Sequence, residues 1–223
     1  GAKVDFIDID PETYNISISA LTKKLDDAQK LGKLPKVVIP VHLTGQPCDM
    51  QAIHILAQHY GFSVVEDASH AIGGKYQSKP IGNCNYSDIT VFSFHPVKIV
   101  TTAEGGIAVT NHAELAEKME LHRSHGITRN PALMTHEADG PWYYQQIELG
   151  YNYRMSDLQA ALGVSQMRRL KDYIERRHSI ADRYTSELEN LPLILPKQAD
   201  FSYSAYHLYV IRLDLEAIKP LSH

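Results

Sequence analysis

The chain has 223 residues, of which 43% are hydrophobic, and its 22 basic and 26 acidic residues give a formal net charge of -4. This length is enough for one large domain, or one domain and part of a second, with a sizeable core. The balance of charges excludes the basic footprint of nucleic-acid-binding or membrane-surface proteins, and no apolar stretch approaches the roughly 20 residues of a membrane span.

Short β-rich runs alternate with amphipathic segments along the first half of the chain, which predicts βα units around a mostly parallel sheet. Strands are expected, in chain order, at residues 3–9, 36–41, 62–66, 89–94, 106–110 and 206–213. Helices are expected at residues 17–31, 49–60, 113–122 and 156–188. Ser17, Asp49 and Ser156 are the expected caps of the first, second and last of these helices, and the second is expected to end at Gly61. The segment from Gly126 to Tyr144 is expected to be a functional loop.

These elements predict an α/β fold in two parts. Residues 1–190 are expected to form the central part of a large domain, and residues 191–223 the beginning of a small C-terminal α/β domain that is cut short. The long helix at 156–188 is expected to bury one apolar side, made of Leu158, Ala161, Leu162, Met167 and Leu170.

The cysteines and histidines indicate neither a disulfide framework nor a metal site. Cys48 and Cys84 are too few and too far apart for either, and they fit the reducing cytosol. The chain contains 12 histidines but no His-Glu-x-x-His helix, and His54 and His59 lie off one helical face. We therefore expect a cytoplasmic protein that uses no metal.

Two residues stand where strands are predicted to end. Ligands of open α/β sheets bind beyond the carboxyl ends of the strands, and Asp67 follows such a strand, although it could equally well cap the next turn. Lys98 follows another strand, which breaks at Pro96. A lysine in a loop is normally solvated. A Schiff-base enzyme, however, needs a lysine, a carboxylate for a pyridine nitrogen and donors for a phosphate, and Lys98, Asp67 and Ser93 could supply them.

Four ordered motifs add a resemblance to a known family. They are Glu66-Asp67-Ala68-Ser69-His70-Ala71, Ser93-Phe94-His95-Pro96-Val97-Lys98, Glu104-Gly105-Gly106 and Gly150-Tyr151-Asn152-Tyr153-Arg154-Met155. Together they resemble the nucleotide-sugar aminotransferases of the DegT/DnrJ/EryC1/StrS family, and the resemblance covers essentially the whole chain. It implies a fold-type I transferase that depends on pyridoxal 5'-phosphate, with a mostly parallel sheet flanked by helices.

The resemblance also implies roles for individual residues. Lys98 would be the catalytic lysine that carries the cofactor, Asp67 the partner of its pyridine nitrogen, and Ser93 a ligand of its phosphate. His70 matches a position near the ring hydroxyl, where the residues alone suggest a histidine satisfied by the turn backbone.

Two further roles fall on the last motif. Asn152 matches an asparagine that reaches the cofactor phosphate of the neighbouring subunit, so a homodimer with shared active sites is expected. Arg154 would either bind substrate or pair with an acid near the interface, and the sequence leaves both open.

Within the family, residues 140–144 and 101–104 most resemble the transaminases that work toward pseudaminic acid. Their reaction moves an amino group from glutamate to C4 of a UDP-linked 4-keto-6-deoxy-N-acetylhexosamine. Another nucleotide-sugar aminotransferase is the first alternative. Dehydration is disfavoured, because the dehydratases of the family replace the lysine with histidine. A truncated dimer core without turnover is the remaining alternative, since family members are longer and place a phosphate cradle before the matched region.

Overall fold

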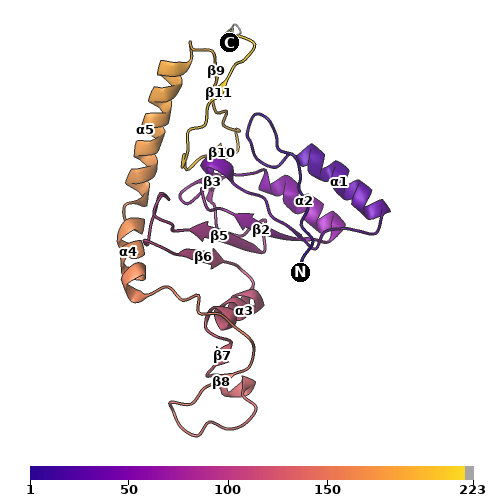
Figure 1. Ribbon diagram of the computed structural model, residues 1–223, viewed down its shortest axis with the longest axis vertical. Coiled ribbons are helices and arrows are strands. Elements are labelled where there is room, and N and C mark those ends of the chain that lie inside the picture. The colour runs from indigo at the N-terminus through magenta and orange to yellow at the C-terminus, as the bar shows by residue number, and fades with distance from the viewer. Residues whose placement is uncertain (219–223) are drawn as a thin grey trace, which may run out of the picture.

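A four-stranded mixed sheet forms the centre of the computed structural model, which describes residues 1–218 (Figure 1). Its strands follow the order β1-β2-β5-β6, with the bounds Val37–Val38, Ser63–Asp67, Ile89–Ser93 and Gly106–Val109. The pairs β1/β2 and β2/β5 are parallel, whereas β6 runs antiparallel to β5. The predicted fold class, an α/β fold with a mostly parallel sheet, is therefore confirmed.

Two helices lie side by side next to this sheet, α1 (Ile18–Lys30) and α2 (Met50–Tyr60) (Figure 1). Their ends follow local signals. The Ser17 side chain accepts a hydrogen bond from the Ala20 N–H at the start of α1, and Asp49 does the same for Ala52 at the start of α2. Gly61, with a φ of 77°, ends α2 in the left-handed conformation that glycine tolerates best. The predicted caps of α1 and α2 and the predicted end of α2 are confirmed.

The two faces of the sheet differ in burial. On β2 and β5 every second residue is buried, namely Val64, Glu66, Thr90 and Phe92. The residues between them point to the opposite face and are only partly buried; they are Val65, Asp67, Val91 and Ser93. We call the first set the covered face and the second the open face. Asp67 and Ser93 thus project from the open face.

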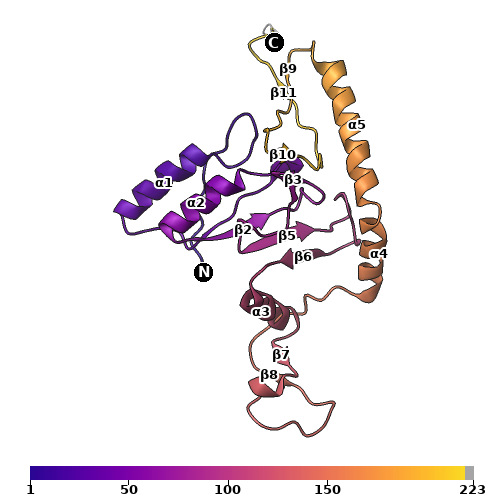
Figure 2. The ribbon, with the colours of Figure 1, turned by 180° about the vertical axis from the view of Figure 1, so that it is seen from behind.

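The second half of the chain builds an arm and a long pair of helices (Figures 1 and 2). The arm, residues 111–155, contains α3 (Ala113–Arg123), a 3-10 turn (Pro131–Leu133) and the antiparallel pair of β7 (Ile127–Thr128) and β8 (Gln145–Gln146). It projects away from the sheet. The helices α4 (Asp157–Met167) and α5 (Leu170–Leu188) run along one side of the molecule.

The single helix predicted at 156–188 is wrong, because α4 and α5 are separate helices. The backbone leaves the helix at Arg169, with φ of -103° and ψ of 2°, although no proline or glycine marks the break. The predicted apolar side is also wrong for α4, where Leu158 is 87% exposed. Of these two helices, only α5 buries apolar side chains, through Ile174 and Ala181. The Ser156 cap is confirmed as part of a capping box.

Three predicted strands differ from the structure as well. Of residues 36–41, only Val37–Val38 form a strand, with an isolated bridge from Val41 to Asp67. Residues 3–9 form no strand, and only an isolated bridge joins Ile9 to Ile16, because no other segment of residues 1–218 pairs with the exposed Val4 and Phe6. Of residues 206–213, only β11 (Arg212–Leu213) is a strand.

Short antiparallel pairs complete the described chain. The strand β10 (Ser202–Tyr203) pairs with β3 (Lys75–Tyr76), which pairs with β4 (Lys79–Pro80). The strand β9 (Leu193–Ile194) pairs with β11. The small domain predicted for 191–223 stays a prediction, and its last residues, 219–223, lie outside the described chain.

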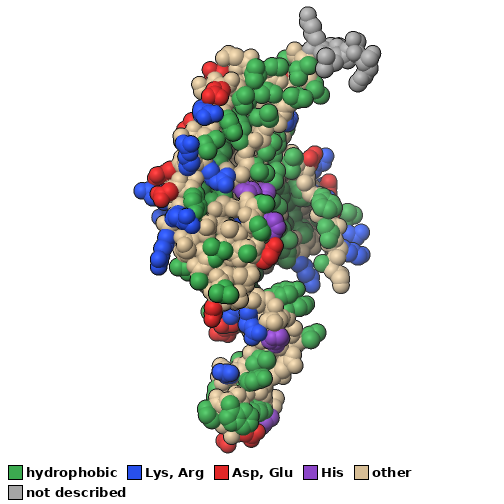
Figure 3. All heavy atoms as spheres, turned by 60° about the vertical axis from the view of Figure 1, so that its left-hand side comes forward, with side chains coloured by type: hydrophobic (Ala, Val, Ile, Leu, Met, Phe, Trp, Pro, Cys, Tyr) green, Lys and Arg blue, Asp and Glu red, His purple; other side chains and the backbone are tan. Residues whose placement is uncertain are grey.

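The surface carries many apolar side chains, and Figure 3 shows them both in the upper part of the molecule and at the tip of the arm. On the arm they include Trp142, which is 67% exposed, and Leu149, which is 86% exposed. None of the helices within residues 1–218 combines the length and the apolar character that a membrane crossing requires.

Candidate active site

Two of the predicted site residues stand at neighbouring strand ends. Asp67 is the last residue of β2 and Ser93 the last residue of β5, and the parallel pairing of these strands brings both carboxyl ends to one edge of the sheet. The Oδ1 atom of Asp67 accepts a hydrogen bond from the Ser69 N–H at 3.0 Å, and the Ser93 Oγ atom accepts one from the His95 N–H at 3.3 Å. These hydrogen bonds fix the backbone turns from which the Asp67 and Ser93 side chains project.

Lys98 lies in a tightly bonded loop between β5 and β6. Its N–H donates to the His95 carbonyl at 2.9 Å, and the loop is closed where the Phe94 N–H donates to the Gly105 carbonyl at 2.8 Å. The residues that follow it, Ile99 and Val100, are buried in the core. The half-buried Lys98 side chain therefore starts from an anchored backbone rather than from a free surface loop.

His70 joins Lys98 and Asp67 into one electrostatic group. Burial lowers the pKa of His70 first, the charge of Lys98 lowers it further, and the Asp67 carboxylate acts in the opposite direction. Lys98 and Asp67 are therefore both near enough to His70 to act on its pKa. The structure brings together Lys98, Asp67 and His70, with Ser93 at the adjacent strand end.

His207 is a site residue that the sequence analysis missed. Its ring lies against that of His70, with the two centroids 4.5 Å apart. Burial, together with the charges of His70, Lys98 and Arg177, lowers the pKa of His207 to about 4, so its ring is neutral near pH 7. The Nδ1 atoms of both rings are buried and find no hydrogen-bond partner within residues 1–218. Two unpartnered polar atoms beside an amine are typical of a site that receives a polar ligand.

The segment 204–208, which carries His207, is held in place by residues that are distant in sequence. The Ala205 N–H donates to the Gly45 carbonyl at 2.9 Å, and the Leu208 N–H donates to the Thr44 carbonyl at 3.1 Å. No local motif marks this contact. Only an analysis of long-range pairs could have found His207, because nothing in the surrounding sequence points to the strand ends.

We expect Gly45→Ala to loosen segment 204–208. Gly45 has a φ of 107°, and an added Cβ would lie 2.9 Å from both the His70 carbonyl oxygen and the Tyr206 amide nitrogen. Because these are backbone atoms, the free energy of unfolding should fall by about 2 to 4 kcal/mol, as measured by urea denaturation. Gly32→Ala is the matched control, since Gly32 also has a positive φ but nothing within 4 Å. Equal losses in both variants would show that the packing of Gly45 contributes nothing.

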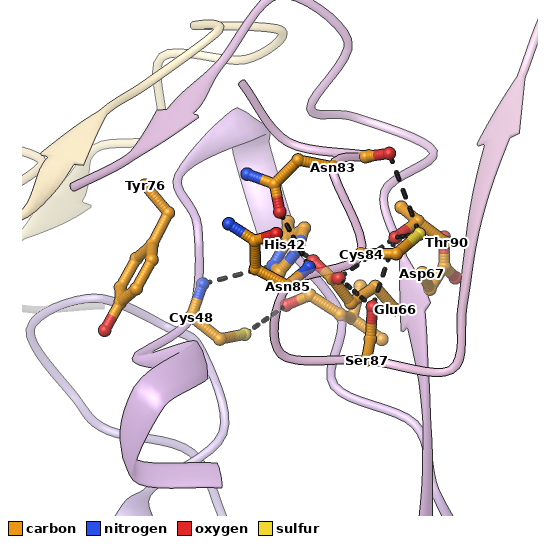
Figure 4. A network of polar contacts seen from close by, with 12 residues as sticks. His42, Cys48, Glu66, Asp67, Tyr76, Asn83, Cys84, Asn85, Ser87 and Thr90 are labelled. Carbon is orange, nitrogen blue, oxygen red and sulfur yellow. Dashed lines mark hydrogen bonds and ion pairs between the residues drawn. The ribbon is translucent and has the colours of Figure 1, made fainter. Parts of the chain in front are cut away.

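A buried polar network lies on the covered face, directly behind Asp67 (Figure 4). The His42 Nε2 atom is 2.7 Å from Glu66 Oε2, and the Thr90 hydroxyl donates to Glu66 Oε1 at 2.9 Å. The Ser87 hydroxyl donates to the same oxygen. Burial alone would raise the pKa of the Glu66 carboxyl, but these donors outweigh it and hold the pKa below its ordinary value.

Glu66→Gln should destabilise the fold in a pH-dependent manner. A glutamine would direct its own N–H groups at donors that now meet a carboxylate, so the free energy of unfolding should fall by about 2 kcal/mol at pH 7. The folded-state pKa of Glu66 is lowered, so its contribution is present above the unfolded-state pKa of about 4.3 and is lost as the pH falls through the folded value.

Urea denaturation of both proteins from pH 7 to pH 3 measures this difference in stability, which should shrink at the acid end. Glu117→Gln, on the exposed side of α3, is the control and should leave the stability unchanged. A difference that stays constant across the pH range would contradict a buried carboxylate.

Asn152 and Arg154 lie on the arm, and the structure does not bring them to Asp67 and Lys98. Arg154 Nη2 donates to Asn152 Oδ1 at 2.9 Å and lies 3.3 Å from His125 Nε2. No carboxylate within residues 1–218 forms an ion pair with Arg154. Arg154 borders a surface hollow of about 510 Å³ that is lined by Ser124, His125, Ile127, Arg129, Tyr144 and Arg154. Asn152 and Arg154 are both exposed.

Within residues 1–218, no group of three or more His, Cys, Asp or Glu side chains is arranged to hold a metal ion. The chemistry that the site offers on its own is that of one amine, one carboxylate and two neutral imidazoles. Such a set can bind a carbonyl compound covalently and move protons near it.

The sequence matches the family model of the DegT/DnrJ/EryC1/StrS aminotransferases over residues 1–221. Among curated proteins, the spore coat polysaccharide biosynthesis protein SpsC of Bacillus subtilis is 41% identical over 96% of this chain and 53% of its own length. The UDP-4-amino-4,6-dideoxy-N-acetyl-beta-L-altrosamine transaminase of Campylobacter jejuni (serotype O:2) is 38% identical over the same shares.

A solved structure of similar fold is that of Helicobacter pylori PseC, an aminotransferase involved in the biosynthesis of pseudoaminic acid. It superposes with a TM-score of 0.81 at 30% identity, over 95% of this chain and 53% of that chain. Similar structures also include the PLP and PMP forms of a putative sugar aminotransferase from Streptococcus pneumoniae. The chain spans about half the length of the curated relatives that it matches.

Proposed function

The chain belongs to the DegT/DnrJ/EryC1/StrS aminotransferase family, whose cofactor is pyridoxal 5'-phosphate, and we propose that it carries the catalytic lysine of a nucleotide-sugar aminotransferase. The observation that supports this most is that Asp67 at the end of β2 and Lys98 in the loop after β5 both lie near enough to His70 to act on its pKa. The residues fit the cofactor, because the buried Nδ1 atoms of His70 and His207 lack partners beside the amine.

The proposed roles follow from the chemistry of each side chain. Lys98 Nζ would hold the cofactor covalently, the Asp67 carboxylate would keep its pyridine nitrogen protonated, and the Ser93 hydroxyl would donate to its phosphate. His70 would lie near the ring hydroxyl. When bound, the cofactor supplies an electron sink and a carrier for the amino group. Lys98, once released from it, would be the base that moves a proton at the substrate carbon.

For the substrate, we propose a UDP-linked 4-keto-6-deoxy-N-acetylhexosamine that receives its amino group at C4 from glutamate, as a step toward pseudaminic acid. The Campylobacter jejuni transaminase and Helicobacter pylori PseC support this choice. The two substrates would use one site in turn, so ping-pong kinetics are expected. Another nucleotide-sugar acceptor is the alternative, since SpsC is named for spore coat polysaccharide biosynthesis.

The test is to add pyridoxal phosphate to the purified protein and record its visible absorbance, then to reduce with borohydride and locate the label by peptide mass. We expect a new band and a label on Lys98. Glutamate and the UDP-keto-sugar should then yield a UDP-aminosugar detectable by mass. A protein that binds no cofactor under these conditions would instead be a dimer core without turnover.

We further propose that two subunits share each active site, with Asn152 reaching the cofactor phosphate of its neighbour. The exposed position of Asn152 on the projecting arm supports this arrangement. Mixing inactive Lys98→Ala subunits with inactive Asn152→Ala subunits should then restore activity, because one site of each mixed dimer contains both native residues. Glu117→Gln subunits serve as the control partner. Mixtures that exchange subunits but stay inactive would show that each subunit supplies its own asparagine.

A further inference from the structure

His42 contacts the backbone of Asp67 and the side chain of Glu66 at the same time. Its N–H donates to the Asp67 carbonyl oxygen at 3.0 Å, while its ring Nε2 atom is 2.7 Å from Glu66 Oε2. The His42 side chain is completely buried. His42 therefore holds both the backbone of Asp67 and the side chain of Glu66. The Glu66 side chain points to the covered face and that of Asp67 to the open face.

Glu66 in turn ties β2 to the strand that leads into the lysine loop. Its Oε1 atom accepts hydrogen bonds from Ser87, just before β5, and from Thr90 on β5. The same strand ends at Ser93 and continues into the loop of Lys98. The network in Figure 4 thus sets the position of the Asp67 strand end relative to the lysine loop.

The network also carries a charge. Burial opposes a positive charge on the His42 ring. The hydrogen bond from the Cys48 N–H to Nδ1, at 3.1 Å, requires that this nitrogen carry no proton. We therefore assign the neutral ring, with Nε2–H donating to Glu66. The buried network then holds the single negative charge of Glu66.

We propose that His42 and Glu66 are positioning residues for Asp67: they fix the end of β2 and place a second, buried negative charge behind the carboxylate that holds the cofactor cation. This inference rests on the proposed function. A negative charge in a region of low dielectric stabilises a neighbouring cation and so raises the pKa of its proton. The titratable groups around the two carboxylates are His42, Cys48 and Cys84 in the network of Glu66, and His70 near Asp67. Lys98 acts on His70 as well, and His70, Lys98 and Arg177 act on His207.

The test compares variants loaded with pyridoxal phosphate by the pH midpoint of the visible absorption band, alongside their unfolding midpoints in urea. Glu66→Gln should lower the pH midpoint by about half a pH unit or more, because the buried charge is lost. Thr90→Val, which removes one donor and keeps the shape, should shift it less and is the variant to use if Glu66→Gln does not fold. His42→Gln retains an N–H for Glu66 and should recover part of the native midpoint relative to His42→Ala.

Ile53→Val is the matched control, because Ile53 is fully buried in the core at α2 and the change lowers stability without altering a charge. A pH midpoint that stays native in Glu66→Gln and Thr90→Val, while both lose stability as Ile53→Val does, would overturn the inference and leave a merely structural network. A protein that shows no band before any substitution would overturn the proposed function, and the inference with it.

Discussion

Lys98→Ala should abolish covalent attachment of pyridoxal phosphate and lower the rate of amino transfer by at least about a thousandfold, because one side chain supplies both the bond to the cofactor and the proton shuttle. Borohydride reduction followed by peptide mass measures the first effect, and formation of the UDP-aminosugar measures the second. The fold itself should survive, since the loop is held by its backbone hydrogen bonds and by the buried Ile99 and Val100 rather than by the lysine side chain.

Lys79→Ala is the control for this experiment, because Lys79 is an exposed lysine on β4. It should keep both the label and the activity. A Lys98→Ala protein that still forms the aminosugar at the native rate, or that carries the borohydride label on another lysine, would contradict the assignment of the catalytic lysine.

Asp67→Asn should have the second largest effect. Asparagine has nearly the same shape and can still accept the Ser69 N–H through Oδ1, so the turn after β2 should remain intact. It has no negative charge, however, and would no longer favour a protonated pyridine nitrogen. We expect the label on Lys98 to persist while kcat falls by about a hundredfold or more.

Measuring kcat and KM separately distinguishes this result from a loss of binding. A fall in kcat at an unchanged unfolding midpoint supports an electronic role for the carboxylate. Asp172→Asn is the control, because it makes the same change of residue at an exposed position of α5. Native kcat in Asp67→Asn would show that Asp67 only caps its turn, which is the simpler reading of the motif.

The parts of the fold that follow from local signals could be predicted from the sequence. The capping residues Ser17 and Asp49 and the stop at Gly61 act on their own neighbours, so α1 and α2 have the expected bounds within one residue. Strands need partners from elsewhere in the chain, which explains why residues 3–9 fail to form one. The break at Arg169 could not be predicted, because no proline or glycine lies there.

The same distinction holds for the site. Asp67 and Lys98 could be placed together because parallel neighbouring strands end at the same edge, and this rule needs only the order of the elements. His207 could not be placed, because its contact with His70 depends on how the chain returns after α5. The role of Glu66 could not be predicted for a third reason. It alternates with Asp67 along one strand, and a pattern of buried residues does not distinguish a buried carboxylate from an ordinary core position.

The return of segment 204–208 to the loop at Thr44 and Gly45 also bears on how the protein matures. Contacts between residues so far apart in sequence form slowly, because a long loop must close before they stabilise anything. A ribosome releases the end of β2 long before it releases His207. The nascent chain should therefore hold the strand end of Asp67 and the lysine loop before His207 reaches His70.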